Sequence, residues 1–162
     1  MEKIESKRLV LRGLEPNDFN DFWELSKNWK AAPGPDFDKF PIDENGCRNW
    51  FNECLKNNGN TRYIYLHDVN KIIGLITFNG KDENERMDMG HIIHSDYQDN
   101  DIDKEALSMF IEYGFQTMDI KTIITNNDPD QKQNAALYSL GFIDRNQEGG
   151  QLIIEKNNWK SE

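Results

Sequence analysis

Three apolar segments separated only by short polar turns constrain the fold more than any other feature of this sequence. They occupy residues 61–67, 71–79 and 86–94, and the turns between them read DVN and GKDENE. Polar turns between β-prone runs are typical of strands that follow one another directly. The apolar runs are nearly continuous, which indicates strands covered on both faces. The pattern therefore predicts three consecutive strands inside a sheet that has helices on both of its faces.

The segments before these strands predict one more strand and two helices. Residues 7–14 alternate like a strand, and residues 16–30 carry aromatic side chains at helical spacing. Residues 31–42 are rich in proline and are expected to form a loop, after which Asp43 can cap a second helix. The expected buried stripe of that helix consists of Cys47, Trp50, Phe51, Cys54 and Leu55. Both helices are expected to bury these side chains in the core. The alternative is that some of the side chains form the wall of a groove that binds the acceptor substrate.

The segments after the three strands alternate between helix and strand. An amphipathic helix is predicted over residues 103–118, then a strand over 120–126 and a short helix over 131–140. Two closing strands are expected near residues 142–145 and 151–156, joined by a glycine turn. The full order is β-α-α-β-β-β-α-β-α-β-β, with about seven strands, which is typical of an α/β fold with a mixed sheet and helices on both faces.

The charge of the chain excludes two classes of partner. With 19 Lys and Arg against 29 Asp and Glu, the net charge is −10, whereas nucleic acids and anionic membranes both require a basic face. An acidic protein is compatible with a cationic acceptor such as an amine. No segment is apolar for long enough to cross a membrane, and the opening MEKIESKRLVLRGLEP lacks the apolar core of a signal peptide. We therefore expect a single domain over residues 1–162, located in the cytoplasm.

The cysteine and histidine content predicts neither a disulfide nor a metal site. Cys47 and Cys54 lie two helical turns apart, roughly 10 Å, which is too far for a disulfide. They are expected to be buried thiols in a reducing compartment. With three His and no Cys-x-x-Cys pair, a zinc site is not expected. The segment 99–103 resembles part of a calcium loop, but Lys104 and Phe110 stand where such a loop needs Gly and Glu.

Three stretches of the sequence resemble one family of enzymes. The opening IESKRLVLRGLEPNDF is similar to a Glu-x-x-Arg-Leu-x-Leu-Arg strand that runs into a helix. MGHIIHSDYQDNDIDKEALSMFIEYGF is similar to a strand, loop and helix that hold acetyl-CoA, and DPDQKQNAALYSLGF to a strand and helix that end in Leu-Gly-Phe. The chain thereby resembles the GNAT-family N-acetyltransferases, in particular the branch that acetylates the N-termini of ribosomal proteins. Together with the matching order of elements, the three stretches cover nearly the whole chain.

The resemblance implies a fold, a co-substrate and a reaction. In the family two central strands diverge, and the pantetheine arm of acetyl-CoA lies between them against the backbone of the first, which here would be Ile92, Ile93 and His94. The pyrophosphate would lie on the following loop and helix N-terminus, where N–H groups and the helix dipole attract anions. A primary amine, either a protein N-terminus or a small amine, would attack the thioester directly in a ternary complex. A base must take a proton from the ammonium, and an acid must protonate the departing thiolate.

The expected pyrophosphate loop departs from the family pattern, which is Arg/Gln-x-x-Gly-x-Gly/Ala. The corresponding residues here are Gln98, Asp99, Asn100, Asp101, Ile102 and Asp103. Gln98 matches, whereas aspartate stands at both small positions. Glycine lets a backbone approach phosphates closely, and each carboxylate–phosphate pair costs on the order of 3 kcal/mol at roughly 6 Å before screening by solvent. The aspartates of this loop therefore support an alternative hypothesis, in which the protein has lost productive binding of acetyl-CoA.

A second departure lies in the helix expected to follow. The family pattern Pro-Glu-Asn-x-x-Ser falls on residues 129–134, so that Gln131 replaces the Asn and Asn134 replaces the Ser of the expected cofactor contacts. The spacing from Asn134 to Gly141 is also one residue shorter than in the pattern, and one residue rotates a helix by about 100°. Tyr138, the candidate acid for the thiolate, can consequently point elsewhere.

Two residues of the predicted strand 86–94 are candidates for the general base. Asp88 shares a strand face with Gly90. The alternative to a role as the base is that Asp88 is simply a solvated carboxylate on the strand. His91 lies on the opposite face, and an imidazole is a side chain whose natural pKa suits proton transfer. A hydrogen-bonded structural His is the alternative. Asp88, His91 and Tyr138 are therefore the predicted catalytic residues.

Two functions of different classes remain open from the sequence. The first is an acetyl-CoA-dependent N-acetyltransferase that acts on a primary amine. The second is a non-catalytic GNAT-fold module that binds a partner, which the aspartates of the loop and the altered pair Gln131 and Asn134 favour. Relatives in this branch are often monomers or dimers, so we expect a monomer or a homodimer.

Overall fold

The computed structural model describes residues 2–30, 43–56, 59–98, 101–127, 131–145 and 150–160. The chain divides into two compact units. The first consists of Met1–Leu75 with Ile92–Asp96, and the second of Ile76–His91 with Tyr97–Glu162. Among the described residues, no helix combines the length and the apolar character that a membrane span requires.

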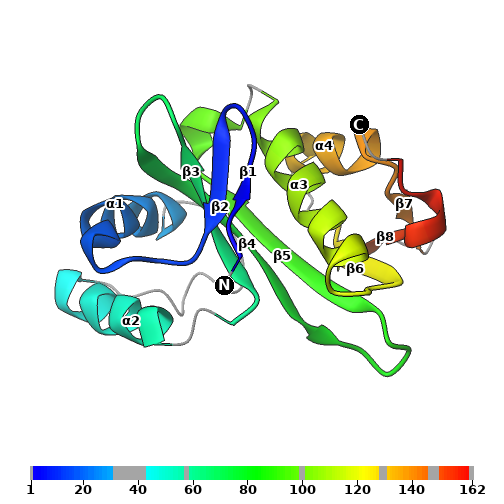
Figure 1. Ribbon diagram of the computed structural model, residues 1–162, viewed down its shortest axis with the longest axis horizontal. Coiled ribbons are helices and arrows are strands. Elements are labelled where there is room, and N and C mark those ends of the chain that lie inside the picture. Colours follow the sequence, from blue (N-terminus) through cyan, green and yellow to red (C-terminus); the bar gives the residue numbers. More distant parts are fainter. Residues whose placement is uncertain are drawn as a thin grey trace. The chain divides into compact units, whose positions relative to one another are not determined.

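The strands form a mixed sheet (Figure 1). They are β1 (Ile4–Glu5), β2 (Leu9–Arg12), β3 (Thr61–Leu66), β4 (Lys71–Lys81), β5 (Met87–Ile93), β6 (Thr122–Asn126), β7 (Ile143–Asp144) and β8 (Gln151–Glu155). Their order is β1-β2-β3-β4-β5-β6-β8-β7, and β5 pairs with β6 in parallel, whereas β1–β2, β2–β3, β6–β8 and β7–β8 are antiparallel. The expected α/β class with a mixed sheet is confirmed.

In the part of the chain that the structure describes, the sheet has eight strands, one more than the expected count of about seven. The strand that the sequence missed is β1, which is only two residues long and therefore too short to show a period. It pairs with β2, Ile4 opposite Leu11 and Glu5 opposite Val10.

The helices lie close to their expected positions. They are α1 (Phe19–Lys30), α2 (Glu44–Lys56), α3 (Ile102–Gln116) and α4 (Gln131–Ser139), with 3-10 turns η1 (Pro16–Asp18), η3 (Ser95–Tyr97) and η4 (Lys156–Asn158). The helix predicted over residues 16–30 begins as the tight turn η1, and the helix predicted over 103–118 is slightly shorter at its end. The loop predicted over residues 31–42 lies outside the described residues.

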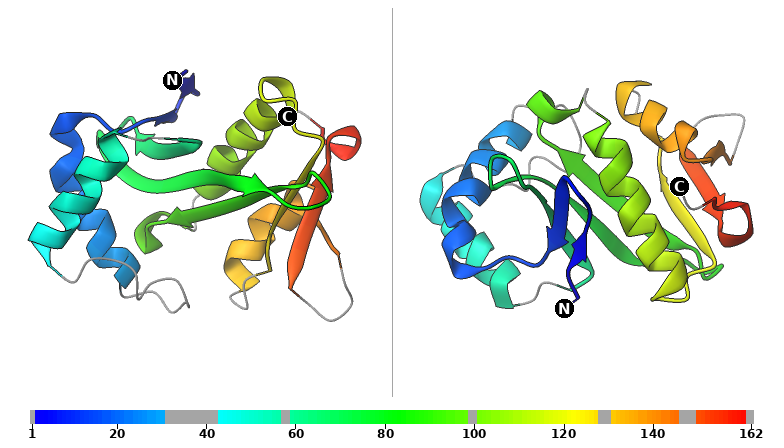
Figure 2. Two further views of the ribbon diagram at one scale, coloured as in Figure 1. Left: turned by 90° about the horizontal axis from the view of Figure 1, so that it is seen from below. Right: turned by 45° about the horizontal axis from the view of Figure 1, so that its top comes forward.

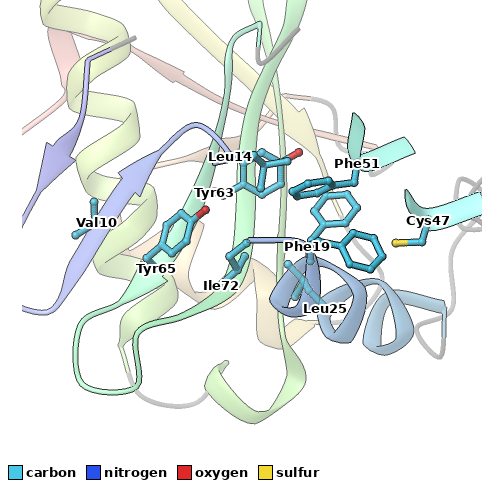
Figure 3. Close-up of a cluster of buried hydrophobic side chains, with 10 residues drawn as sticks. Val10, Leu14, Phe19, Leu25, Cys47, Phe51, Tyr63, Tyr65 and Ile72 are labelled. Carbon is cyan, nitrogen blue, oxygen red and sulfur yellow. The ribbon is translucent and has the colours of Figure 1, made fainter. Parts of the chain in front are cut away.

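In the first unit, α1 and α2 lie side by side (Figure 2) and share an aromatic core with β2 and β3 (Figure 3). The ring of Phe22 lies 4.8 Å from that of Trp50 and 5.2 Å from that of Phe51, centroid to centroid. The buried cluster comprises Val10, Leu14, Phe19, Phe22, Leu25, Cys47, Phe51, Tyr63, Tyr65 and Ile72. The expected stripe of α2 therefore packs in the core, and Trp50, Cys54 and Leu55 cover the cluster from its edge.

The start of α2 confirms the predicted cap. The side chain of Asp43 accepts a hydrogen bond from the backbone N–H of Gly46 at 2.8 Å, and its carbonyl accepts one from Cys47 at 3.0 Å. A carboxylate at this position satisfies an N–H group that has no partner within the helix. The cap therefore fixes where α2 begins.

In the second unit, α3 packs against β4. The ring of Phe78 stacks on that of Phe110, with 4.3 Å between centroids and 21° between planes. A Cβ atom at Gly114 would lie 2.7 Å from the Phe78 ring, so only glycine leaves room for this close packing. The amphipathic stripe predicted for the helix is buried, namely Ala106, Leu107, Phe110, Ile111 and Phe115.

Candidate active site

The pairing between β5 and β6, in the second unit, ends soon after it begins. Two pairs of Cα partners join these parallel strands, Met87 with Ile123 and Asp88 with Ile124. Both strands continue past these pairs, and within their described residues no further partners join them. On its other side β6 is paired with β8 along its whole length. Within the second unit, residues 89–91 of β5 and 125–126 of β6 are therefore suited to an extended ligand that supplies its own hydrogen-bonding groups.

Asp88 stands at the point where this pairing ends. Its Oδ2 accepts a hydrogen bond from Nδ2 of Asn79 at 2.8 Å, and the side chain is half-buried. Gly90 follows on the same face, where a Cβ atom would lie 3.3 Å from Nδ2 of Asn79 and 3.5 Å from Cγ2 of Thr77. Asn79 is not among the residues predicted from the sequence, although the short turn between β4 and β5 places the ends of these strands opposite each other.

His91 lies on the other face of β5. Strand alternation groups it with Met87 and Met89, which are both buried, whereas His91 itself is half-buried. The two candidate bases, Asp88 and His91, therefore point to opposite sides of the sheet and cannot act on the same proton.

The residues expected to meet the pantetheine arm lie at the end of β5, in the first unit. The backbone N–H of His94 donates to the carbonyl of Ile73 at 2.7 Å, and a Cβ atom at Gly74 would lie 2.5 Å from the carbonyl oxygen of Ile92. Both groups are thus directed toward β4. Because backbone groups alternate between the two edges of a strand, Ile93 is the member of this set whose backbone faces the other edge.

Asp101 carries the backbone conformation that glycine favours. Its φ is 55° and its ψ is 7°, in the left-handed region, at the position just before α3. Aspartate is among the few residues other than glycine that tolerate this region, so the replacement preserves the bend of the loop. The carboxylate is exposed, and Gln98 is half-buried. The predicted contacts at Asp99 and Asn100 lie outside the described residues.

The first turn of α3 opposes a bound diphosphate. The carboxylate of Asp103 accepts a hydrogen bond from the backbone N–H of Lys104 at 2.8 Å. This N–H group is one of those that would otherwise bind an anion at the start of the helix. Asp103 and Glu105 both stand in this turn, where acids stabilise the helix through its dipole, and Ile102 is buried. The carboxylates of this turn therefore disfavour an anion at the start of α3.

The hydroxyl of Tyr138 is hydrogen-bonded to a residue that does not belong to β5. It donates to the carboxylate of Asp144, 3.2 and 3.1 Å from the two oxygens. Partial desolvation, followed by the hydrogen bond and charge of Asp144, raises the pKa of Tyr138. Asp144 belongs to β7, the edge strand, with β8 and β6 between it and β5. At about 4.8 Å per strand, Asp144 lies about 14 Å from β5.

A chain of polar side chains continues from Asp144 into α4. Nδ2 of Asn127 donates to Oδ1 of Asp144 at 2.9 Å, and Nδ2 of Asn134 donates to Oδ1 of Asn127. Asn134 is buried, so this network ties α4 to the ends of β6 and β7. The side chain of Gln131 lies outside the described residues. Within the described stretches, no three His, Cys, Asp or Glu side chains are grouped to hold a metal ion.

Comparison with known proteins gives close agreement in fold. An acetyltransferase (GNAT family) from Bacillus anthracis matches with a TM-score of 0.78 and 19% identity, over 96% of this chain and 99% of that one. RimL, a ribosomal L7/L12 alpha-N-protein acetyltransferase in complex with coenzyme A, matches with a TM-score of 0.75 and 16% identity, over 95% of this chain and 98% of that one. At these identities the likeness shows the fold.

Sequence comparison identifies the family. The chain is 25% identical over 130 residues to the uncharacterized N-acetyltransferase YnaD of Bacillus subtilis (strain 168), covering 78% of this chain and 74% of that protein. The family model of the acetyltransferase (GNAT) domain matches residues 8–143. The predicted resemblance to GNAT-family N-acetyltransferases is confirmed by the family model and this relative, and the chain shares its fold with the ribosomal-protein acetyltransferase RimL. The chain belongs to the GNAT acetyltransferase family.

Proposed function

We propose that this protein transfers an acetyl group from acetyl-CoA to a primary amine. The observation that carries the proposal is the end of the β5–β6 pairing after Asp88 and Ile124. Beyond this point β5 can add an extended, amide-bearing ligand as if it were a further strand. Acetyl-CoA, when bound, supplies an acyl thioester that an amine can attack. On this proposal Ile93 and the residues just before it in β5 would bind the arm.

The proposed general base is Asp88. An amine is protonated at neutral pH and must lose a proton before it can attack a carbonyl. The half-buried carboxylate of Asp88 is held by Asn79 and borders the stretch of β5 that β6 leaves unpaired. His91, on the other face of β5, is the alternative base. The activities of variants at Asp88 and His91 distinguish the two candidates.

Tyr138 is the weakest of the three catalytic candidates. Its hydroxyl is hydrogen-bonded to Asp144 on the edge strand, and about 14 Å of sheet separates that strand from β5. A proton donor must come within hydrogen-bonding distance of the atom that it protonates. The proposal therefore does not require Tyr138 for protonation of the thiolate.

The acceptor class follows from charge and from the relatives. The net charge of −10 favours approach of a cationic ammonium group. RimL is described as an alpha-N-protein acetyltransferase, which supports a protein N-terminus, and a small amine has the same reacting group. We infer that the protein acts as a monomer or homodimer in solution.

The alternative function is a GNAT-fold module that binds a partner without transferring an acetyl group. The carboxylate of Asp103 on the amide of Lys104 favours this alternative, because it competes with a phosphate for the helix N-terminus. On that account the protein would not bind acetyl-CoA at millimolar concentration.

Acetyl transfer can be tested with a panel of amines. Short peptides with a free N-terminus, the same peptides with a blocked N-terminus, and spermidine are incubated with acetyl-CoA, and the products are identified by mass spectrometry. We expect acetylation of free amines only, and a loss of about a hundredfold in kcat for Asp88→Asn at unchanged melting temperature. No transfer, together with no thermal stabilisation by millimolar acetyl-CoA, would favour the binding module, because a ligand at 100 times its Kd adds about 2.7 kcal/mol.

A further inference from the structure

Asn79 is the hydrogen-bond donor that the structure assigns to the proposed base. Its Nδ2 lies 2.8 Å from Oδ2 of Asp88, across the hairpin of β4 and β5. We infer that Asn79 is a positioning residue, which holds one oxygen of the Asp88 carboxylate so that the other oxygen can take the proton of the amine. This inference rests on the proposed function.

Gly90 keeps the place of the Asn79 amide open. A Cβ atom at Gly90 would lie 3.3 Å from Nδ2 of Asn79, which is a tighter contact than side chains usually make. The backbone of Gly90 is not in the left-handed region, so its conformation does not demand glycine. A side chain at this position would therefore press on the amide that binds Asp88.

The neighbouring charges do not replace this contact. Lys81 is paired with Glu85, with 2.7 Å between Nζ and Oε2, and Arg86 is paired with Asp82, with 2.5 Å between Nη2 and Oδ2. The β6 partner of Asp88 is the apolar Ile124. A neutral amide donor stabilises the ionised carboxylate and orients it without forming an ion pair that would block proton transfer.

The chemistry needs this arrangement because a base acts only from a productive orientation. A half-buried carboxylate without a hydrogen-bond donor samples several rotamers, and a small misplacement of a catalytic group costs large factors in rate. Asn79 is itself exposed, so replacing it should cost little stability. A loss of activity in a variant of Asn79 therefore reports on Asp88 and not on folding.

The decisive variant is Asn79→Leu, which keeps the size of the side chain and removes the donor. In the peptide assay we expect kcat to fall about tenfold, with KM for acetyl-CoA and for the peptide within about twofold. The kcat of Asn79→Asp should be lower still, because this variant removes the donor and places a second carboxylate beside that of Asp88, which repels it. Asn84→Ala, in the turn of the same hairpin, is the matched control and should leave kcat unchanged.

A double-mutant cycle separates positioning from a structural role. In an Asp88→Ala background, Asn79→Leu should have no further effect on kcat. An unchanged kcat in Asn79→Leu alone, or an equal loss in both backgrounds, would overturn the inference while leaving acetyl transfer in place.

The contact can also be tested without activity, from the NMR signal of the Asn79 side-chain amide. We expect this signal to shift in Asp88→Ala and to stay in place in Asn84→Ala. An unshifted signal would overturn the inference even if the enzyme is active, whereas failure of acetyl transfer in wild-type protein would instead count against the proposed function.

Discussion

Arg12 and Asp18 form a two-point ion pair at the start of the first helical segment. Nη1 and Nη2 of Arg12 lie 2.9 and 3.1 Å from the two carboxylate oxygens of Asp18. The same carboxylate accepts the hydroxyl of Tyr65 and the backbone N–H of Glu15, each at 2.6 Å. The guanidinium also lies over the Tyr65 ring, 3.7 Å from its centroid. The last Arg of the opening motif thus ties β2 and β3 to η1.

Removal of this carboxylate should destabilise the fold. Asp18 is 9% exposed, and a buried ion that loses its partner costs about 3–5 kcal/mol, so Asp18→Ala is expected to lower the free energy of unfolding by about 3 kcal/mol in urea. Glu15→Ala is the control, because Glu15 is an exposed partner of Arg12 at 3.4 Å and such pairs contribute about 0–1 kcal/mol. Equal losses in the two variants would contradict the role of Asp18.

Alkaline pH should weaken the fold through two tyrosines. Burial, with the hydrogen bond to Asp18, raises the pKa of Tyr65, and burial, with Cys54 beside it, raises the pKa of Tyr63. Above the ordinary tyrosine pKa of about 10 the unfolded chain loses these protons and the folded chain keeps them. Stability is therefore full below pH 10 and falls above it, by up to about 1.4 kcal/mol per pH unit for each tyrosine.

The measurement is the free energy of unfolding between about pH 8 and pH 11. We expect Tyr65→Phe to reduce the slope of this curve above pH 10. A slope unchanged by Tyr65→Phe would show that the tyrosine does not stay protonated in the folded protein.

Removing acidic groups at the start of α3 should strengthen binding of acetyl-CoA. The double variant Asp101→Gly with Asp103→Ala keeps the left-handed bend and deletes two carboxylates near the expected phosphates, so we expect Kd to fall about tenfold or more. Glu112→Gln, which removes a charge from the C-terminal half of the same helix, should change Kd little. Calorimetry that finds unchanged or weaker binding in the double variant would show that phosphates do not lie at this helix end.

Tyr138→Phe should leave catalysis nearly intact. The variant removes the hydrogen bonds of an exposed hydroxyl to Asp144 and is expected to change the free energy of unfolding little, with kcat within about twofold of wild type because the hydroxyl is far from β5. A loss of kcat above about tenfold, with a pH profile that loses its alkaline limb, would restore Tyr138 as the acid.

The sequence predicted the elements that have a long, regular pattern. The apolar runs of β3 to β5 and the stripes of α2 and α3 were found because burial repeats along them. The Asp43 cap was found because its chemistry is local. β1 was missed because two residues carry no period.

The site was harder to predict, because its contacts depend on how separate segments align. Asn79 meets Asp88 through the register of a hairpin, which no local pattern encodes. The hydroxyl of Tyr138 meets Asp144 because of the rotation of α4 and the course of β7. The family pattern places a glycine at Asp101, and the sequence did not reveal that an aspartate there holds the left-handed bend.

The most direct test of the account is the binding place of acetyl-CoA, mapped by the backbone amide signals of the labelled protein. We predict that saturation with acetyl-CoA shifts the signals of residues 89–91 of β5 and 125–126 of β6 more than those of β8. Shifts that avoid these two segments, or the absence of any shift at millimolar acetyl-CoA, would contradict an acetyl donor between the diverging strands.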